Sequence, residues 1–170
     1  MTQAPRFLFD ECLGRPVVEH QIRDSLRLYG ADAEIAHLLS KFPMSTKDSV
    51  WIPMIAQEEG WIVVTADRGK HSRKDERLPL ICREFSVTYV MLTSGLHKRT
   101  MYYKYLAISS CWPALLDAAS HPPGTGFSLG IHGERQFRFK KIRDARSPGS
   151  GIAHQETLFD LSPPPDEAAD

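Results

Sequence analysis

Two apolar runs in the sequence end in an acidic residue. Asp10 follows the run Phe7–Phe9, and Asp67 follows the run Trp61–Thr65 after a single alanine. Asp48 lies between them, at the start of a predicted helix. Three carboxylates in one pocket repel one another and stay ionised only beside a cation, and carboxylate oxygens suit Mg²⁺ or Mn²⁺. Because such a metal stabilises a phosphoryl transition state and activates water, the three residues predict phosphodiester hydrolysis.

Each of these acids also has a purely structural explanation. Asp48 is in a position to cap a helix, Asp10 to end a strand at the surface, and Asp67 to form a turn. Glu11 is either a further ligand or a solvent-facing neighbour of Asp10. The joint pattern carries more weight than any single member, because two independent strands both end in Asp.

Basic residues follow the same strand ends. A polar loop after Asp67 and a second one after the next predicted strand supply cations that suit a phosphate backbone, and these contacts would make RNA binding salt-dependent. We predict that five of them bind RNA: Arg68, Lys70, Arg73, Lys98 and Arg99. The alternative is that both loops are simply solvated polar segments.

The charges are distributed unevenly along a chain that is neutral as a whole. The 170 residues include 21 Lys and Arg and 21 Asp and Glu, which by itself argues against a generally basic nucleic-acid binder. Residues 1–62 carry a net charge of −3, residues 63–146 of +8 and residues 147–170 of −5. The basic middle segment creates a local field that attracts phosphate even at zero net charge.

Apolar runs and helical spacing alternate along the chain. We predict strands at 6–10, 31–39, 61–65 and 88–93, helices at 16–29, 45–60, 75–85 and 97–120, and a β-hairpin at 127–132 and 136–142. Strands that alternate with helices form a mostly parallel sheet with helices on both faces. The predicted fold class is therefore α/β, with a C-terminal helix and hairpin. In such sheets ligands bind at the carboxyl ends of the strands.

Several residues predict where these helices begin and end. Pro16 suits the first position of a helix, and Gly30 suits its C-terminal cap. Ser45 and Asp48 have the spacing of a capping box, and Gly60 is placed to end the helix that they open.

The composition indicates one domain over residues 1–146 and a tail over residues 147–170. The tail is acidic and rich in Pro, Ser and Gly, which predicts disorder. No apolar run approaches the ~20 residues of a membrane span, and the N-terminus does not have the pattern of a secretory signal. The three cysteines are widely spaced, which is typical of reduced thiols in the cytoplasm. We therefore expect a cytoplasmic protein with no membrane partner.

Three segments carry a resemblance to a known family. The segments Phe7–Glu11, Asp48–Ala56 and Trp61–Asp67 resemble a PIN-like domain, of the group that includes VapC-type toxins and Mut7-C-like proteins. In that pattern an Asp ends the first strand, a second Asp opens a helix, and T-x-D ends the next strand. The resemblance covers about residues 6–94 and implies a three-layer PIN-like fold.

The resemblance also implies an activity. It implies that the protein is a Mg²⁺- or Mn²⁺-dependent endoribonuclease, with Asp10, Asp48 and Asp67 as catalytic, metal-binding carboxylates. PIN domains carry a further Glu between the first two acids; Glu34 is the nearest acid in order, and Glu11 is the alternative. Toxins of this type pair with an antitoxin and many self-associate, so the resemblance implies a toxin with a cognate antitoxin and a homodimer.

Two other functions remain open on the sequence. A phosphoacceptor receiver module also has acids after its first and third strands, but Asp67 lies too far beyond Asp10, and Lys98 falls past the end of the last strand that it would need to close. A dehalogenase-like phosphatase needs a second Asp where Cys12 stands. The other function that remains open is that of a catalytically inactive PIN-like interaction domain.

Overall fold

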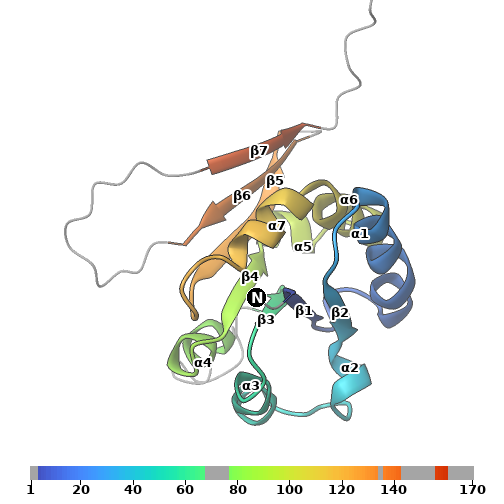
Figure 1. Ribbon diagram of the computed structural model, residues 1–170. Helices are drawn as coiled ribbons and strands as arrows, with labels where there is room; N and C mark the ends of the chain where they lie inside the picture. Colours follow the sequence, from blue (N-terminus) through green and yellow to red (C-terminus); the bar gives the residue numbers. More distant parts are fainter. Residues whose placement is uncertain (1–3, 68–76, 134–135, 143–155, 161–170) are drawn as a thin grey trace, which may run out of the picture.

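The fold is described from a computed structural model, which describes residues 4–67, 77–133, 136–142 and 156–160. Within these residues one sheet has the strand order β2-β1-β3-β4-β5-β6-β7 (Figure 1). Its strands are β1 (Arg6–Phe9), β2 (Glu34–His37), β3 (Trp61–Thr65), β4 (Thr88–Leu92), β5 (Gly126–His132), β6 (Gln136–Lys141) and β7 (Glu156–Asp160). Neighbours from β2 to β5 pair in parallel, and β6 and β7 are antiparallel additions at one edge.

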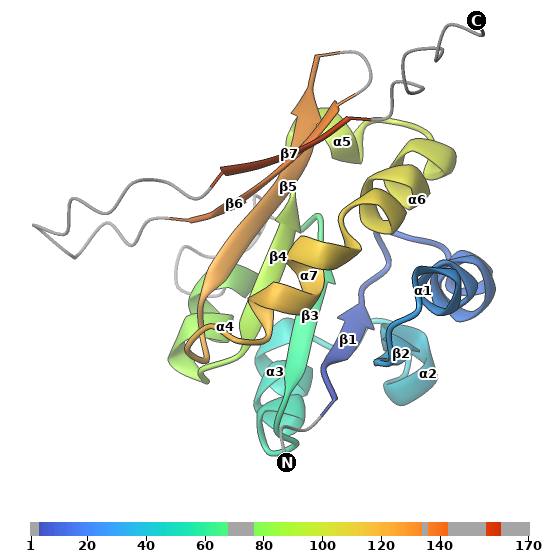
Figure 2. The same ribbon diagram turned by 45° about the horizontal axis from the view of Figure 1, so that its top comes forward.

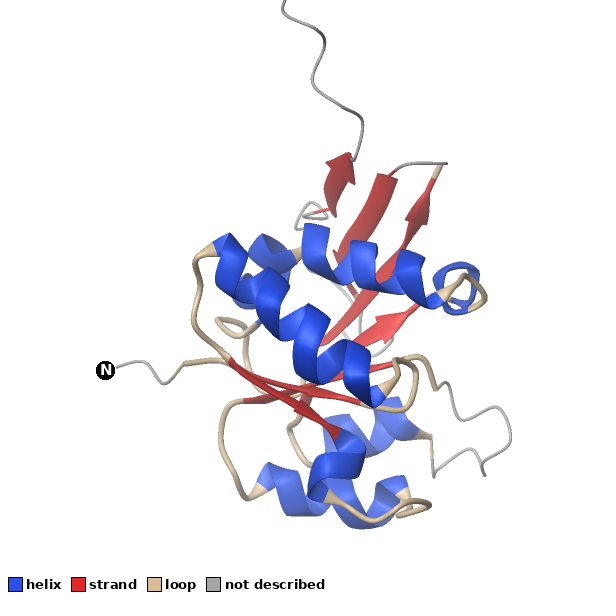
Figure 3. Cartoon of the chain, turned by 90° about the vertical axis from the view of Figure 1, so that its right-hand side faces the viewer, coloured by secondary structure: helices blue, strands red, loops and turns tan. Residues whose placement is uncertain are grey.

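Helices cover both faces of this sheet, and Figure 3 shows the sheet between them. They are η1 (Val17–Ile22, a π-helix), α1 (Arg23–Tyr29), α2 (Leu38–Lys41), α3 (Asp48–Ala56), α4 (Leu78–Glu84), α5 (Ser94–His97), α6 (Met101–Ser110) and α7 (Trp112–Ala118). η1, α1, α6 and α7 pack on one face, and α2, α3 and α4 pack on the other. Figure 2 shows α6 and α7 from the side of the first group. The predicted three-layer α/β fold is confirmed.

Alternation within the central strands explains the two cores. In β1, Phe7 and Phe9 face the core under α6 and α7, whereas Leu8 faces the core under α3 and α4. Successive side chains of a strand point to opposite faces, so a strand that is covered on both sides reads as a continuous apolar run. Phe7 packs edge-on against Trp112, with ring centroids 5.6 Å apart. These runs are the reason that the sequence predicts the strands well.

The strand order reverses between β1 and β3. β2 pairs with one side of β1, whereas β3, β4 and β5 extend the sheet from the other side. The carboxyl ends of β1 and β3 therefore flank a topological switch point, which is where open α/β sheets bind ligands. Asp10 and Asp67 directly follow these two strands.

The predicted boundaries of two helices are only partly right. Gly30 does end α1, with a φ of 83° and its N–H bonded to Arg27 and Leu26 oxygens. The capping box was wrong: α3 begins at Asp48 with Lys47 as its N-cap, and Ser45 has a φ of 66° in a turn that Thr46 closes on Pro43. α3 also ends at Ala56, before Gly60 is reached.

The long helix predicted over residues 97–120 is three shorter ones. α5, α6 and α7 divide residues 94–118, and α6 ends at Ser110. Pro113 lies in the first turn of α7, where its missing N–H costs nothing, whereas in one continuous helix it would break a hydrogen bond. Pro79 is likewise tolerated in the first turn of α4. The hairpin of β5 and β6 is confirmed.

Part of the predicted tail belongs to the sheet. Residues 156–160 form β7, which pairs antiparallel with β6, so the prediction of disorder was wrong for these five residues. An exposed β6 edge offers unpaired backbone groups, which a later segment of the chain satisfies. The other residues of 147–170 lie outside the described part. Among the described residues no helix is long and apolar enough to cross a membrane.

Candidate functional site

Asp10 is held in place by backbone and side-chain hydrogen bonds. Its N–H donates to the Val64 oxygen at 3.1 Å, which extends the pairing of β1 with β3. Its Oδ1 accepts from the Cys12 N–H at 2.8 Å, and its Oδ2 accepts from the Thr65 hydroxyl. Burial raises the pKa of the Asp10 carboxyl, the hydrogen bonds from Cys12 and Thr65 oppose this rise, and the charge of Asp67 adds to it.

Thr65 connects the two strand ends. Its hydroxyl donates to Asp10 and accepts from the Asp67 N–H at 2.9 Å, and the side chain is fully buried. The T-x-D pattern thus has a structural reason, because the threonine fixes the start of the turn that carries Asp67. Asp67 itself is exposed at the rim.

Asp48 enters the site from α3. It is the first residue of that helix and is half-buried, and its Oδ1 accepts from the indole N–H of Trp51 at 2.9 Å. Burial raises the pKa of Asp48, and the hydrogen bond from Trp51 opposes the rise. The charges of Asp67, Asp10 and Glu11 raise this pKa further, so the acids act on one another electrostatically.

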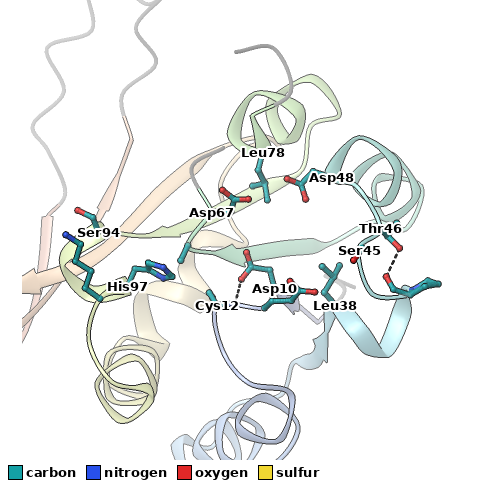
Figure 4. Close-up of a pocket in the computed structure, with 14 residues that line it drawn as sticks. Asp10, Cys12, Leu38, Ser45, Thr46, Asp48, Asp67, Leu78, Ser94 and His97 are labelled. Atoms are coloured by element: carbon teal, nitrogen blue, oxygen red, sulfur yellow. Dashed lines mark hydrogen bonds between the residues drawn. The ribbon is translucent and has the colours of Figure 1, made fainter. Parts of the chain in front are cut away.

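One pocket of about 520 Å³ connects these acids. Figure 4 shows Asp10, Asp48 and Asp67 around it, with His97 and Ser94 of α5 farther along its wall. Its lining combines acids, small polar groups, one lysine and a few apolar side chains: Asp10, Glu11, Cys12, Leu38, Pro43, Ser45, Thr46, Asp48, Ala66, Asp67, Leu78, Ser94, His97 and Lys98. The structure therefore brings together the three predicted aspartates, Glu11 and Lys98.

Other predicted site residues lie elsewhere. Glu34 begins β2 opposite Arg6, at the amino end of the sheet, and forms an ion pair of 2.7 Å with it, so it is not part of this pocket. Arg99 does not line the pocket, and its guanidinium lies 5.6 Å from the ring centre of Tyr103. The three remaining predicted RNA contacts lie outside the described residues: Arg68, Lys70 and Arg73.

Lys104 lies beside the site but was not predicted from the sequence. This lysine of α6 is only 8% exposed, and its ammonium donates to the Cys12 oxygen at 3.1 Å. Helical spacing offered the signal, because Lys104 shares a face with the buried residues Ala107 and Ile108, three and four positions later. A lysine on the core-facing side of a helix needs a partner, which is the loop after β1.

The donor chemistry of the pocket fits a divalent cation. Carboxylates from separate elements line it; burial raises the pKa of Asp10 and of Asp48, and the charges of neighbouring acids add to both rises, so a bound cation would favour the ionised acids. Asp10 is also oriented by two hydrogen bonds, as ligands commonly are. In the described part of the chain, no three His, Cys, Asp or Glu side chains lie close enough together to hold a metal ion as they stand, so binding by all three aspartates would require their side chains to move closer together.

Comparison with known proteins agrees with this arrangement. No curated protein and no solved structure matches the chain. A family model described as "PIN like domain" matches residues 5–94, more than half of the chain, and its span contains all three aspartates. Proteins of this family are generally nucleases. The chain thus belongs to the PIN-like domain family.

Proposed function

We propose that the protein is a Mg²⁺- or Mn²⁺-dependent endoribonuclease that hydrolyses RNA phosphodiester bonds. The observation that carries the proposal is the meeting of Asp10, Asp48 and Asp67 in one pocket, at the switch point of a PIN-like sheet. Burial and neighbouring charges raise the pKa of Asp10 and Asp48, so a cation nearby would favour the ionised acids, and metal-assisted hydrolysis uses such a cation.

The chain's own residues take distinct parts in this proposal. Asp10, Asp48 and Asp67 would hold the metal, which when bound activates the attacking water and stabilises charge on the phosphoryl group. Thr65 and the Cys12 N–H keep the Asp10 carboxylate oriented, and Trp51 does the same for Asp48.

The RNA backbone would approach along the basic side of the pocket. Lys98 lines the same pocket as the acids and would bind a phosphate next to the reacting one. Arg99 follows it directly on the same connection. The predicted contacts of Arg68, Lys70 and Arg73 are supported by sequence alone, since these residues immediately follow Asp67.

The finer assignment is the toxin of a toxin–antitoxin pair, which acts in the cytoplasm with a cognate antitoxin and as a homodimer. Its support is the sequence resemblance to VapC-type toxins. Expression of the wild-type protein from an inducible promoter should then arrest bacterial growth, and Asp67→Asn should not. Equal growth with both proteins at equal expression would argue against a toxin and leave the nuclease proposal to the test below.

Cleavage of a circular RNA tests the nuclease proposal. A closed circle has no end for an exonuclease, so linear products in Mn²⁺ and none in EDTA would show metal-dependent endonucleolytic cleavage. Asp67→Asn should lower the rate about 100-fold or more, because a catalytic metal contributes several kcal/mol. The matched control is Asp32→Asn, at an exposed aspartate outside the pocket. Equal rates for the two variants would contradict the proposal.

A further inference from the structure

A segment that begins in the pocket leads to exposed aromatic residues. Ser94, His97 and Lys98 line the pocket, and α6 begins three residues after Lys98. In its first turn Met101 is 37% exposed, Tyr102 64% and Tyr103 37%. Large side chains are rarely left at a surface in such a group without a function.

Lys104 fixes this turn of α6 next to the loop that follows β1. Its buried ammonium donates to the Cys12 oxygen, and the Cys12 N–H donates to Asp10. Tyr103 is the neighbour of Lys104 in sequence, so the exposed rings belong to a turn whose other face touches the loop that carries the first acid. The tyrosines therefore belong to the same turn of α6 that contacts the loop after β1, and α6 follows the pocket-lining Lys98 by three residues.

All the Asp, Glu, Lys and Arg residues near Tyr102 and Tyr103 in the sequence are basic. No Asp or Glu occurs between residues 85 and 116, whereas Lys98, Arg99 and Lys104 do. The Arg99 guanidinium lies 5.6 Å from the Tyr103 ring centre, and the rings of Tyr102 and Tyr103 are 6.3 Å apart at 79°. Exposed aromatic rings with cations between them are how proteins bind single-stranded nucleic acid, since bases stack on the rings and phosphates meet the cations.

We propose that Tyr102 and Tyr103, with Arg99, form a base-stacking subsite for single-stranded RNA whose backbone passes Lys98 into the acidic pocket. The inference rests on the proposed nuclease function and adds a base-stacking subsite on α6 to it. A duplex keeps its bases stacked inside the helix, so this subsite selects unpaired RNA and tolerates many sequences. Val50 and Met54 of α3 are also exposed, but they are aliphatic and offer no such stacking surface.

Binding without cleavage tests the subsite. A fluorescein-labelled 12-nucleotide single strand and a hairpin of the same length are titrated with the protein in EDTA, with fluorescence anisotropy as the readout. We expect Tyr102→Ala and Tyr103→Ala each to weaken binding of the single strand about tenfold. Tyr102→Phe should retain the affinity, because the ring is kept. Tyr29→Ala, which removes a 50% exposed tyrosine of α1, is the matched control and should bind like the wild type.

Photo-crosslinking gives a readout that does not depend on variants. A single strand that carries 5-iodouridine should crosslink to a peptide containing Tyr102 or Tyr103 of the wild-type protein. Crosslinks confined to other peptides would overturn the proposal. Alanine variants of Tyr102 and Tyr103 that bind RNA as well as Tyr29→Ala would also overturn it. The same holds if these variants keep the RNA affinity but differ from the wild type in molecular mass by light scattering, because the rings would then belong to a protein interface.

The two proposals fail in different ways. If the tyrosine variants lose RNA affinity and the wild type still cleaves no circular RNA, the stacking subsite stands and the nuclease proposal is wrong. If the wild type cleaves and the tyrosine variants bind RNA unchanged, the subsite alone is wrong.

Discussion

Both ends of the central sheet carry acidic residues, but the surroundings of these residues differ in charge. At the amino end, Glu58 accepts from the indole N–H of Trp61 and forms ion pairs with Arg6 and Lys41. At the carboxyl end, Asp48 accepts from the indole of Trp51 at the same three-residue spacing. Among the described residues Asp48 has no ion pair.

This difference shows in the pKa values. Hydrogen bonds from Trp61 and Lys41, together with the charges of Lys41 and Arg6, lower the pKa of Glu58. Burial and the charges of neighbouring acids raise the pKa of Asp48. The same local device, an acid bonded to a tryptophan three residues later, is part of a neutralised surface network at one end and of a repulsive cluster at the other. The carboxyl end, where the charges of neighbouring acids raise the pKa of Asp48, is the one that fits a cation.

Cleavage rates should separate the two ends most clearly. Asp48→Asn should lower metal-dependent cleavage of circular RNA about 100-fold or more, because it removes a proposed ligand of the metal. Glu58→Gln changes an acid of the same setting at the other end and should leave the rate within about twofold of the wild type, since a lost surface contact is worth little. Equal losses in both variants would show that the comparison has no functional meaning.

Thr65 tests how far the acidic end depends on its supporting hydrogen bonds. Thr65→Val removes the hydroxyl that joins Asp10 to the Asp67 N–H and should lower the cleavage rate about 10- to 100-fold, as the loss of a ligand's supporting group commonly does. Thr65→Ser keeps the hydroxyl and should restore most of the rate. A serine variant as slow as the valine variant would assign the loss to packing instead.

Metal binding should raise the free energy of unfolding through the acids at the carboxyl end of the sheet alone. At a Mn²⁺ concentration about 100 times its Kd, the free energy of unfolding should rise by about 2.7 kcal/mol. Chemical denaturation with and without Mn²⁺ measures this rise. Asp48→Asn should reduce it strongly, whereas Glu34→Gln, which changes an acid paired with Arg6, should leave it unchanged. A rise that survives in Asp48→Asn would place the metal elsewhere.

The pH dependence of stability should have opposite signs at the two ends, with the smallest effect of the four. In EDTA the raised pKa of Asp48 gives a contribution that is present below the unfolded pKa, about 4, and is lost as the pH rises through the folded pKa. The lowered pKa of Glu58 gives one that is present above about pH 4.3 and is lost as the pH falls through the folded pKa.

Urea unfolding of wild type, Asp48→Asn and Glu58→Gln at several pH values measures both contributions. The advantage of Asp48→Asn over the wild type should grow from pH 4 to pH 7. The disadvantage of Glu58→Gln should shrink on acidification and stay below about 1 kcal/mol, since Glu58 is exposed. Parallel pH profiles for the three proteins would remove the electrostatic contrast.

The sequence predicted the parts of the fold that depend on local pattern. Strands covered on both faces appear as apolar runs, so β1 and β3, and with them Asp10 and Asp67, were placed correctly. The Ser45 cap failed because a turn with positive φ intervenes, and Pro113 divided a stretch that reads as one apolar helix. Both outcomes depend on backbone geometry, which residue spacing does not encode.

The errors at the site come from tertiary arrangement. Glu34 has the right order in the chain for a ligand, but it begins β2, and parallel pairing with β1 puts the starts of strands at the end opposite to Asp10. Lys104 lies 92 residues from its partner Cys12, a separation that no local pattern bridges. The local sequence pattern therefore predicted the acids that follow strands. Which other charged residues lie beside them depends on strand pairing and on contacts between distant segments.

The loop from Asp10 to Cys12 is fastened from two sides, by Thr65 of β3 and by Lys104 of α6. Its ordering entropy is therefore lost when the protein folds and not when a ligand binds. A cation that arrives at Asp10 meets a carboxylate already oriented, so less of its interaction energy at that residue is offset by the cost of ordering the loop. The hydrogen bond from Lys104 joins α6 to the loop that carries Asp10, so if RNA bound at α6 changes the affinity for a cation at Asp10, the cation changes the affinity for RNA by the same factor.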